Sequence, residues 1–141
     1  MILLDTNVIS EMMREVPDGR VATWLGRQKS LHLAVTTITI AEIQRGLKRL
    51  PAGKRRKTLE ASFADFISRG FQGRVIPFDE PAARLYGDVC AMRESKGLHA
   101  DALDLMIAAI AKAADASLAT RNTGDFEHCG IKLIDPWKFA P

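Results

Sequence analysis

The chain is poor in thiols and in histidine, the ligands that zinc sites use. Its two cysteines, Cys90 and Cys129, lie far apart and form no CxxC pair. Its three histidines, His32, His99 and His128, are scattered as well. A structural zinc site or a disulfide framework needs such residues in closely spaced groups. We therefore predict that both cysteines are reduced packing residues and that the chain holds no zinc.

The chain also lacks long apolar runs and glycine-rich phosphate loops. No apolar run approaches the roughly 20 residues that cross a bilayer, so we expect no contact with a membrane. The start Met1-Ile2-Leu3-Leu4-Asp5 has no basic region before an apolar stretch and no cleavage-site pattern after it. We therefore expect no signal peptide and a cytoplasmic protein. Neither GxxxxGK(S/T) nor GxGxxG occurs, which argues against a nucleotide site built on a phosphate loop.

The size and charge of the chain suit a small basic domain. Its 141 residues predict one domain, 1–141, with one sizeable core. The formal net charge is +3, and the basic residues gather in 45–57, a stretch without acids: Arg45, Lys48, Arg49, Lys54, Arg55, Arg56 and Lys57. Such a stretch would attract phosphate backbones. A solvated helix face and loop, or a surface for an acidic protein partner, would also explain it.

Short apolar segments alternate with helical patterns along the chain. We expect strands at 2–4, 31–35, 74–78, 117–120 and 131–134. We expect helices at 8–13, 21–27, 37–50, 57–67, 80–96 with Asp79 as its N-cap, and 101–114. This order implies an α/β fold with a parallel sheet covered on both faces. A site in such a sheet lies outside the carboxyl ends of the strands, where Asp5 and the loop 121–125 stand.

Two acids have both a structural and a chemical interpretation. Asp5 directly follows an apolar strand, and a carboxylate held there by rigid backbone suits a metal ligand. Alternatively, Asp5 or Asn7 caps the following helix. Glu42 lies three residues after Thr39, and that spacing matches a capping box in which Glu42 reaches back to the helix start. On spacing alone, the cap is the favoured interpretation of Glu42.

Asp104 is the most informative acid. It lies at the edge of a predicted buried stripe, with small neighbours that allow close approach. The stripe is formed by Leu103, Met106, Ile107 and Ile110. A half-buried carboxylate needs a partner, which is either a metal ion or a nearby Arg or Lys. Asp101 is rotated toward solvent, where a cap or helix-dipole role is sufficient, although it can also support the site from outside.

Several carboxylates in one crevice favour a hard cation. Gathered acids raise each other's pKa unless a cation neutralises them. Oxygen-only ligands select Mg²⁺ or Mn²⁺, and such ions activate water for in-line attack on a phosphodiester. This hypothesis of a metal-dependent nuclease needs no catalytic Ser-His or Cys-His set.

Four ordered motifs resemble the PIN-domain family, and within it the VapC and FitB-like toxins of bacterial toxin–antitoxin pairs. They span nearly the whole chain, and their order and separations make the resemblance specific. The motifs are 1–11 with Asp5-Thr6-Asn7, 37–46 with Glu42, the helix segment Asp104-Leu105-Met106-Ile107-Ala108-Ala109, and 118–126. The terminal Ile134-Asp135-Pro136-Trp137 is similar to the family as well.

The resemblance implies a three-layer α/β/α sandwich around a mostly parallel five-stranded sheet. It implies an endoribonuclease that uses Mg²⁺ or Mn²⁺, with Asp5, Glu42 and Asp104 as the acidic site. In this hypothesis Asp5 and Asp104 hold the metal, directly or through water, and Glu42 orients or deprotonates the attacking water. It further implies a homodimer and a cognate VapB-like antitoxin, through which alone operator DNA is bound.

The resemblance has one departure and several further implied contacts. Many relatives carry an acid where this chain has Asn122, and Asp125 matches an acid that is also common there. Asn122 positions water or phosphate, or Asp125 completes the catalytic set; the sequence leaves this open. The remaining implied contacts with water or substrate are Thr6, Asn7 and Thr120. The implied contacts with RNA or with the antitoxin are Arg45, Lys48 and Arg49.

Two other functions compete with this hypothesis. A PIN-like module could bind nucleic acid or a partner with weak or no nuclease activity, which Asn122 favours and the three retained acids disfavour. A phosphatase of the haloacid-dehalogenase type would need a second aspartate two residues after Asp5. Position 7 is Asn, which argues against that class.

Overall fold

The fold is an α/β sandwich whose sheet is entirely parallel. A computed structural model describes residues 1–99 and 101–141. The five strands are β1 (Ile2–Leu4), β2 (Leu33–Thr36), β3 (Val75–Ile76), β4 (Ser117–Ala119) and β5 (Leu133–Ile134). They lie in the order β3-β2-β1-β4-β5, and every pairing between neighbours is parallel. The prediction of a five-stranded, mostly parallel sheet is confirmed.

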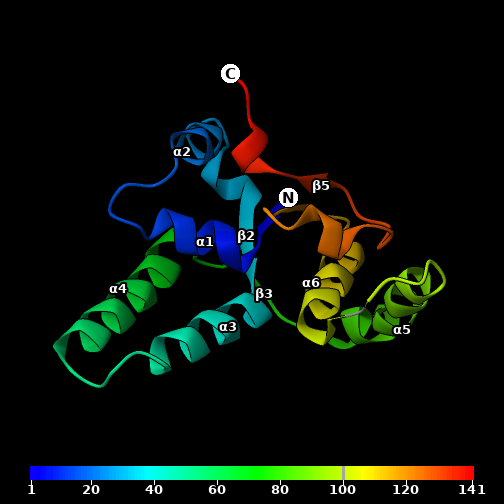
Figure 1. The fold of residues 1–141 in the computed structure, drawn as a ribbon, viewed down its shortest axis with the longest axis horizontal. Helices are drawn as coiled ribbons and strands as arrows, with labels where there is room; N and C mark the ends of the chain where they lie inside the picture. Colours follow the sequence, from blue (N-terminus) through cyan, green and yellow to red (C-terminus); the bar gives the residue numbers. More distant parts are fainter. Residues whose placement is uncertain (100) are drawn as a thin grey trace.

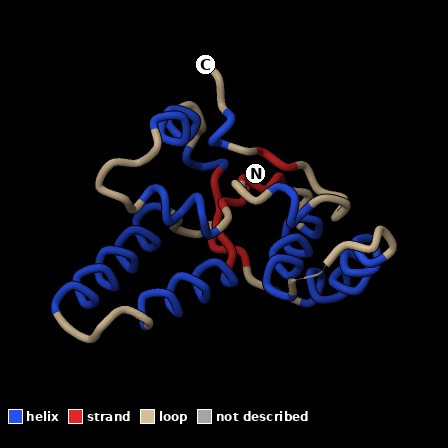
Figure 2. Tube along the Cα trace, in the orientation of Figure 1, coloured by secondary structure: helices blue, strands red, loops and turns tan. Residues whose placement is uncertain are grey.

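Within residues 1–99 and 101–141, six α-helices and three short 3₁₀ helices accompany the strands. The α-helices are α1 (Thr6–Met12), α2 (Gly19–Gly26), α3 (Thr37–Lys48), α4 (Lys54–Gly70), α5 (Glu80–Glu94) and α6 (Ala102–Ala113). The 3₁₀ helices are η1 (Ser30–His32), η2 (Thr123–Phe126) and η3 (Pro136–Lys138). Figure 1 shows α1 to α4 on the left of the strands, and α5 and α6 on the right. Figure 2 shows the strands as a narrow layer between these two groups of helices.

Apolar side chains point alternately to the two faces along each strand, which explains why helices cover both faces of the sheet. Leu3 belongs to the apolar cluster under α5 and α6, while Leu4 belongs to the cluster under the other helices. In β4, Leu118 and Ala119 divide between the same two clusters. Successive side chains of a strand point to opposite faces, so each strand feeds two cores. The expected three-layer arrangement is confirmed.

The boundaries of several helices and strands differ from the sequence prediction, and a side-chain cap explains the first of these differences. The first helix begins at Thr6 rather than at residue 8, because Asp5 caps it directly. The strand expected at 31–35 is shifted to Leu33–Thr36, and η1 occupies Ser30–His32. The helix expected at 57–67 extends over Lys54–Gly70. Asp79 is the N-cap of α5, as predicted.

Two residues of the buried stripe predicted for α6 are not buried. Met106 is only partly buried, and 39% of Leu103 is exposed. Leu103 lies in the first turn of the helix, beside a surface groove that it lines together with α3. Further along α6, residues 107–111 are all buried, because this part is enclosed between the sheet and α5. No helix in the described part of the chain is long and apolar enough to cross a membrane.

Candidate active site

The candidate site lies where β1 and β4 end. These two strands are parallel neighbours in the sheet, so the residues that follow them meet at one edge. Asp5 follows β1 directly, and Thr120 follows β4. Both residues are buried, with 4% of Asp5 and none of Thr120 exposed. The sheet therefore fixes the position of the central carboxylate.

The Asp5 carboxylate combines the cap and site geometries that the sequence left open. Its Oδ1 accepts a hydrogen bond from the Thr6 backbone N–H at 2.8 Å, which caps α1. Its Oδ2 accepts one from the Thr120 hydroxyl at 2.7 Å and one from the Asn7 side-chain amide at 3.4 Å. Burial raises the pKa of Asp5, while the Thr120 and Thr6 hydrogen bonds lower it and the negative charge of Asp125 raises it.

Glu42 is a site-facing side chain rather than part of a capping box. The prediction that Thr39 caps this helix is wrong: the N-cap is Thr36, whose hydroxyl accepts the Thr39 N–H at 3.1 Å. Glu42 is therefore in the second turn, too far along to reach the helix start. Its carboxylate accepts the Thr6 hydroxyl at 2.8 Å. Burial raises the pKa of Glu42, and the charge of Asp5 adds to this, against the Thr6 hydrogen bond.

Asp104 is the most perturbed acid of the site. It is half-buried in the first turn of α6, and its backbone N–H donates to the Asp101 side chain at 3.1 Å. Asp101 is the N-cap of α6 and is exposed, as predicted. Burial raises the pKa of Asp104 to about 7, helped by the charges of Asp101, Asp5, Asp125 and Glu42, in that order. These acids therefore resist simultaneous ionisation in the absence of a cation.

The loop after β4 brings Asn122 closer to the site than Asp125. Asn122 lines the pocket, and its backbone N–H donates to the Thr120 hydroxyl at 3.1 Å. Asp125 lies in η2, is exposed and is not among the pocket's lining residues, although its charge raises the pKa of Asp5 and of Asp104. The residue that lines the pocket and the residue that adds negative charge from outside it are thus different.

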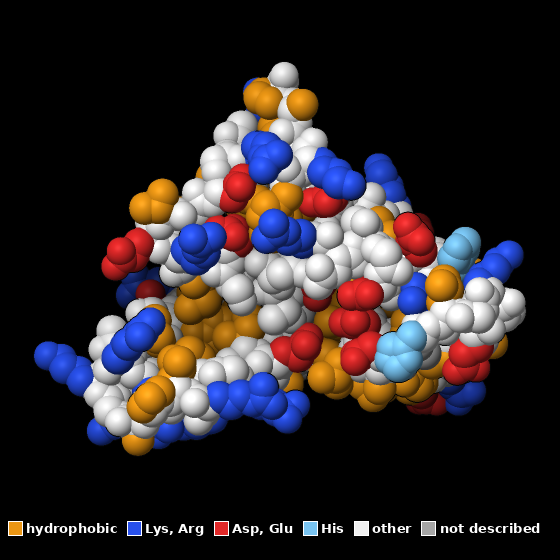
Figure 3. Space-filling model, viewed as in Figure 1, with side chains coloured by type: hydrophobic (Ala, Val, Ile, Leu, Met, Phe, Trp, Pro, Cys, Tyr) orange, Lys and Arg blue, Asp and Glu red, His pale blue; other side chains and the backbone are white. Residues whose placement is uncertain are grey.

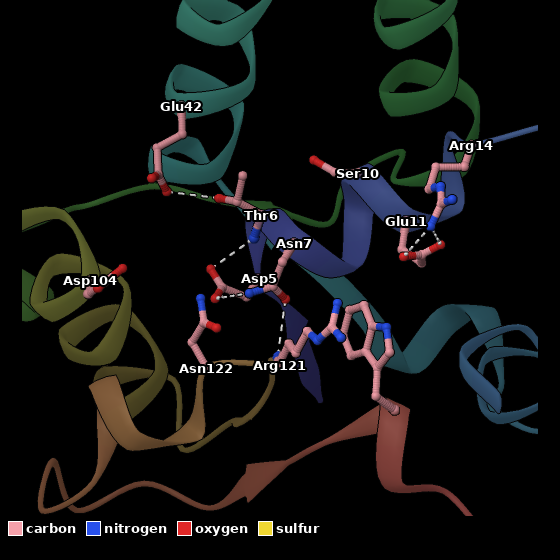
Figure 4. A pocket seen from close by; sticks show the side chains of 11 residues that line it. Asp5, Thr6, Asn7, Ser10, Glu11, Arg14, Glu42, Asp104, Arg121 and Asn122 are labelled. Carbon is pink, nitrogen blue, oxygen red and sulfur yellow. Dashed lines mark hydrogen bonds and ion pairs between the residues drawn. The ribbon is translucent and has the colours of Figure 1, made fainter. Parts of the chain in front are cut away.

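One open pocket of about 580 Å³ collects the three predicted acids. Figure 4 shows their side chains coming from the end of β1, from α3 and from α6. The full lining is Asp5, Thr6, Asn7, Ser10, Glu11, Arg14, Glu42, Asp104, Arg121, Asn122 and Trp137. A pocket of this size takes a small ligand or part of a polymer.

Five of these lining residues were not predicted as site residues. Ser10 and Glu11 come from α1, where their spacing from Asn7 places them near it on the helix surface, and Arg14 lies in the segment after that helix. That spacing was the available signal for Ser10 and Glu11. Arg121 was visible only as a neighbour of Thr120, and Trp137 only as a residue of the similar C-terminal segment.

The predicted basic contacts divide into two kinds. Arg45 and Arg49 line a second groove, of about 260 Å³, which also includes Glu42 and the exposed Leu103. Lys48 instead forms an ion pair with Glu60 of α4 at 3.2 Å. Figure 3 shows acidic side chains near the middle of this face and basic ones along the region of α3 and α4. A basic surface therefore borders the acidic pocket.

The acids fit a cation that keeps much of its own hydration. In residues 1–99 and 101–141, no three Asp, Glu, His or Cys side chains are close enough to enclose one metal ion. Mg²⁺ is commonly held by one or two carboxylates and completes its shell with water or phosphate oxygens. Buried and half-buried oxygen ligands without sulfur or imidazole suit that mode better than a closed zinc cage.

Comparison with known proteins places this geometry in a family. The PIN domain family model matches residues 2–132. VapC ribonuclease Y4jK from Sinorhizobium fredii is 41% identical over 140 residues, which cover 99% of this chain and 100% of that protein. Toxin FitB from Neisseria gonorrhoeae is 39% identical over 137 residues, covering 97% and 99%.

A solved structure agrees with the sequence relatives. The structure of FitAB bound to an IR36 DNA fragment superimposes with a TM-score of 0.92 at 38% sequence identity. The match covers 100% of this chain and 99% of that one. The family model, the relatives and the fold agree with one another, and the chain belongs to the PIN-domain family.

Proposed function

We propose that the chain is the toxin of a toxin–antitoxin pair and acts as an Mg²⁺- or Mn²⁺-dependent endoribonuclease. The observation that carries the proposal is the convergence of Asp5, Glu42 and Asp104 in one open pocket, with the pKa of Asp104 raised to about 7. Such a cluster is costly without a cation. The similarity to a protein named a VapC ribonuclease and to one named a toxin supports the same conclusion.

Each acid has a distinct role in this proposal. Asp5 is held by three hydrogen bonds and supplies a rigid carboxylate. Asp104 would supply the second carboxylate for the cation, and it would do so in its deprotonated form. A bound Mg²⁺ or Mn²⁺ would polarise the phosphodiester and lower the pKa of an attacking water. Glu42, oriented by the Thr6 hydroxyl, positions that water and accepts its proton.

Polar residues around the three acids complete the proposed site. Thr120 and Asn7 hold the Asp5 carboxylate, so their role is to orient it. Asn122, which lines the pocket, positions water or phosphate there. Asp125 contributes negative charge from outside the lining and strengthens the attraction for a cation.

The proposed partners are inferred from the family and from the basic residues on the surface of the chain. We propose a cognate VapB-like antitoxin that blocks the pocket, operator DNA bound through that antitoxin, a homodimer, and a cytoplasmic location. The FitAB structure bound to DNA supports the antitoxin and DNA parts of this proposal. Arg45 and Arg49, next to Glu42 in the second groove, contact the RNA backbone or the antitoxin.

The test is cleavage of RNA by the purified chain, freed of any partner. The parent chain should cut RNA with Mg²⁺ or Mn²⁺ and be inactive with EDTA. Asp5→Asn should lower the cleavage rate at least ~100-fold, while Asp88→Asn, a change of an exposed acid on α5, should leave it unchanged. If the parent binds RNA but cuts none with either ion, the chain is a binding module. Hydrolysis of small phosphomonoesters in place of RNA would instead support a phosphatase.

A further inference from the structure

The pocket contains two arginines with very different surroundings. Arg14 contacts both carboxylate oxygens of Glu11, the closer at 3.0 Å. Glu11 is buried and also accepts the Asp18 backbone N–H at 3.1 Å. The charge of Arg14 is therefore neutralised within α1 and the loop that follows it.

Arg121 is the uncompensated cation of the pocket. It is exposed and immediately follows Thr120. In the described part of the chain, its guanidinium has no hydrogen-bond or ion-pair partner. Its backbone is nevertheless fixed, because its N–H donates to the Asn7 side-chain oxygen at 3.2 Å. Figure 4 shows Arg121 and Asp104 on opposite sides of Asp5 in this view.

An aromatic ring orients the Arg121 side chain. Its guanidinium carbon lies 5.2 Å from the centroid of the Trp137 ring, within the range of a cation–π interaction. Trp137 is itself buried, and its backbone N–H donates to the Asp135 carboxylate at 2.9 Å. Burial of the ring and the fixed backbone together hold Trp137 in place beside Arg121. A guanidinium that interacts with a ring keeps N–H donors free for another ligand.

The negative charge of the pocket makes a cation without a carboxylate partner useful there. Asp5, Glu42 and Asp104 line the same cavity, and their negative charges repel an approaching phosphate. A free guanidinium at the rim offsets that repulsion and offers a planar pair of donors that matches two phosphate oxygens. A phosphate group therefore fits the position better than a neutral ligand.

We propose that Arg121, supported by Trp137, binds a backbone phosphate of the RNA strand next to the phosphate that is cut. The inference rests on the proposed nuclease function and adds a substrate-binding residue to it. Arg121 acts on binding of the strand and takes no part in the proton transfers assigned to the acids. Its loss therefore raises KM much more than it lowers kcat.

The chain supplies a matched control for Arg121. Arg27 is also exposed, and its guanidinium carbon lies 5.3 Å from the centroid of the Phe139 ring. Arg27 does not line the pocket. Arg27→Gln therefore removes one positive charge and one cation–π contact at a distance from the acids. Any effect of net charge alone appears in both variants.

Binding is measured by fluorescence anisotropy with a short, labelled single-stranded RNA in EDTA, over a series of KCl concentrations. Arg121→Gln should weaken binding by about tenfold at low salt, and the slope of log K against log salt should fall by about 0.7, the value for one phosphate contact with a single strand. Arg121→Lys should keep the slope, because it keeps the charge. Arg27→Gln should match the parent. With Mg²⁺, KM for Arg121→Gln should rise by about the same factor while kcat changes less than about threefold.

The outcomes separate this inference from the proposed function. If the parent cuts RNA but Arg121→Gln and Arg27→Gln have the same slope and KM, the Arg121 assignment is wrong and the nuclease function stands. An effect of Arg121→Gln on antitoxin affinity alone would overturn it in favour of a peptide contact. If the parent binds RNA in an Arg121-dependent way and cuts none, the nuclease function fails and the phosphate contact stands. A parent that neither binds RNA nor cuts it with Mg²⁺ or Mn²⁺ refutes both.

Discussion

Asp104→Asn should stabilise the metal-free protein near pH 8, although it removes a residue of the proposed active site. The pKa of Asp104 is raised from its ordinary 3.8 to about 7, mainly by burial. The folded chain thus binds this proton more tightly than the unfolded chain does. The free energy of unfolding therefore falls as the pH rises from about 4 to about 7. An asparagine has no charge to bury and avoids this loss.

The size of the effect follows from the same pKa. A raised pKa corresponds to about 1.4 kcal/mol for each pH unit, so the change from 3.8 to about 7 sets an upper limit of ~4 kcal/mol on the gain in stability. Asp104 is only half-buried, so solvent screening reduces the expected gain to ~1–2 kcal/mol, which corresponds to roughly 3–8 °C in Tm. The gain should be smaller near pH 5, where the carboxyl group is protonated in the folded chain.

Thermal unfolding in EDTA at a series of pH values measures this effect. Asp88→Asn is the control, because it also removes one acid but from an exposed position on α5. Adding Mg²⁺ should raise the Tm of the parent by mass action and should raise that of Asp104→Asn much less. If Asp104→Asn is no more stable than the parent near pH 8, and the two pH profiles run parallel, the assigned burial of charge is refuted.

Two further predictions concern residues that hold the site together. Thr120→Val removes the buried hydroxyl that donates to Asp5 at 2.7 Å; it should lower stability by ~1–3 kcal/mol and cleavage by about 10–100-fold, with Thr120→Ser near the parent in both assays. Arg93 is buried, and its guanidinium donates to the carbonyls of His99, Gly124 and Glu127 at 2.8–3.1 Å. Arg93→Met should therefore lower the free energy of unfolding in urea by at least ~3 kcal/mol, and a loss below ~1 kcal/mol would contradict this account.

The presence of the strands was predictable, because a short apolar run between polar segments has few other structures open to it. The residues at which the strands end were not predictable. The segment expected at 74–78 contracts to Val75–Ile76. The Arg74 backbone N–H donates to the Phe71 carbonyl at 2.8 Å rather than to β2, and Pro77 has no backbone N–H to pair. The ladder therefore ends where backbone N–H groups have another partner or are absent, which an apolar pattern does not report.

The interpretation of Glu42 depended on a helix start that spacing alone misplaces. Thr36 and Thr39 are both good N-cap residues, and each is followed by an apolar-periodic segment. The choice is made by the sheet, because β2 continues to Thr36 and the helix must begin there. The resemblance placed Glu42 in the acidic set where local physics did not, and its contact with Thr6 lies 36 residues away in the chain.

Nothing in the sequence indicated the structural role of Arg93. Its partners are main-chain carbonyls of two loops, and a carbonyl is present at every residue whatever the side chain. Those loops precede α6 and surround η2, so the arginine ties the segment before Asp104 to the segment that contains Asp125. The distance between these two acids thus depends on a residue that carries none of the proposed chemistry.

The division between Asn122 and Asp125 follows from charge as well as from position. Asp104 already has its pKa raised to about 7 in this pocket, so a further carboxylate without a cationic partner in the lining would add repulsion. Asn122 avoids that repulsion and still offers an amide to water or phosphate. Asp125 is exposed, where water lowers the cost of its charge, yet its field still acts on Asp5 and Asp104. The acid set is thus compatible with binding of one cation, and the amide at position 122 does not by itself argue for a chain without nuclease activity.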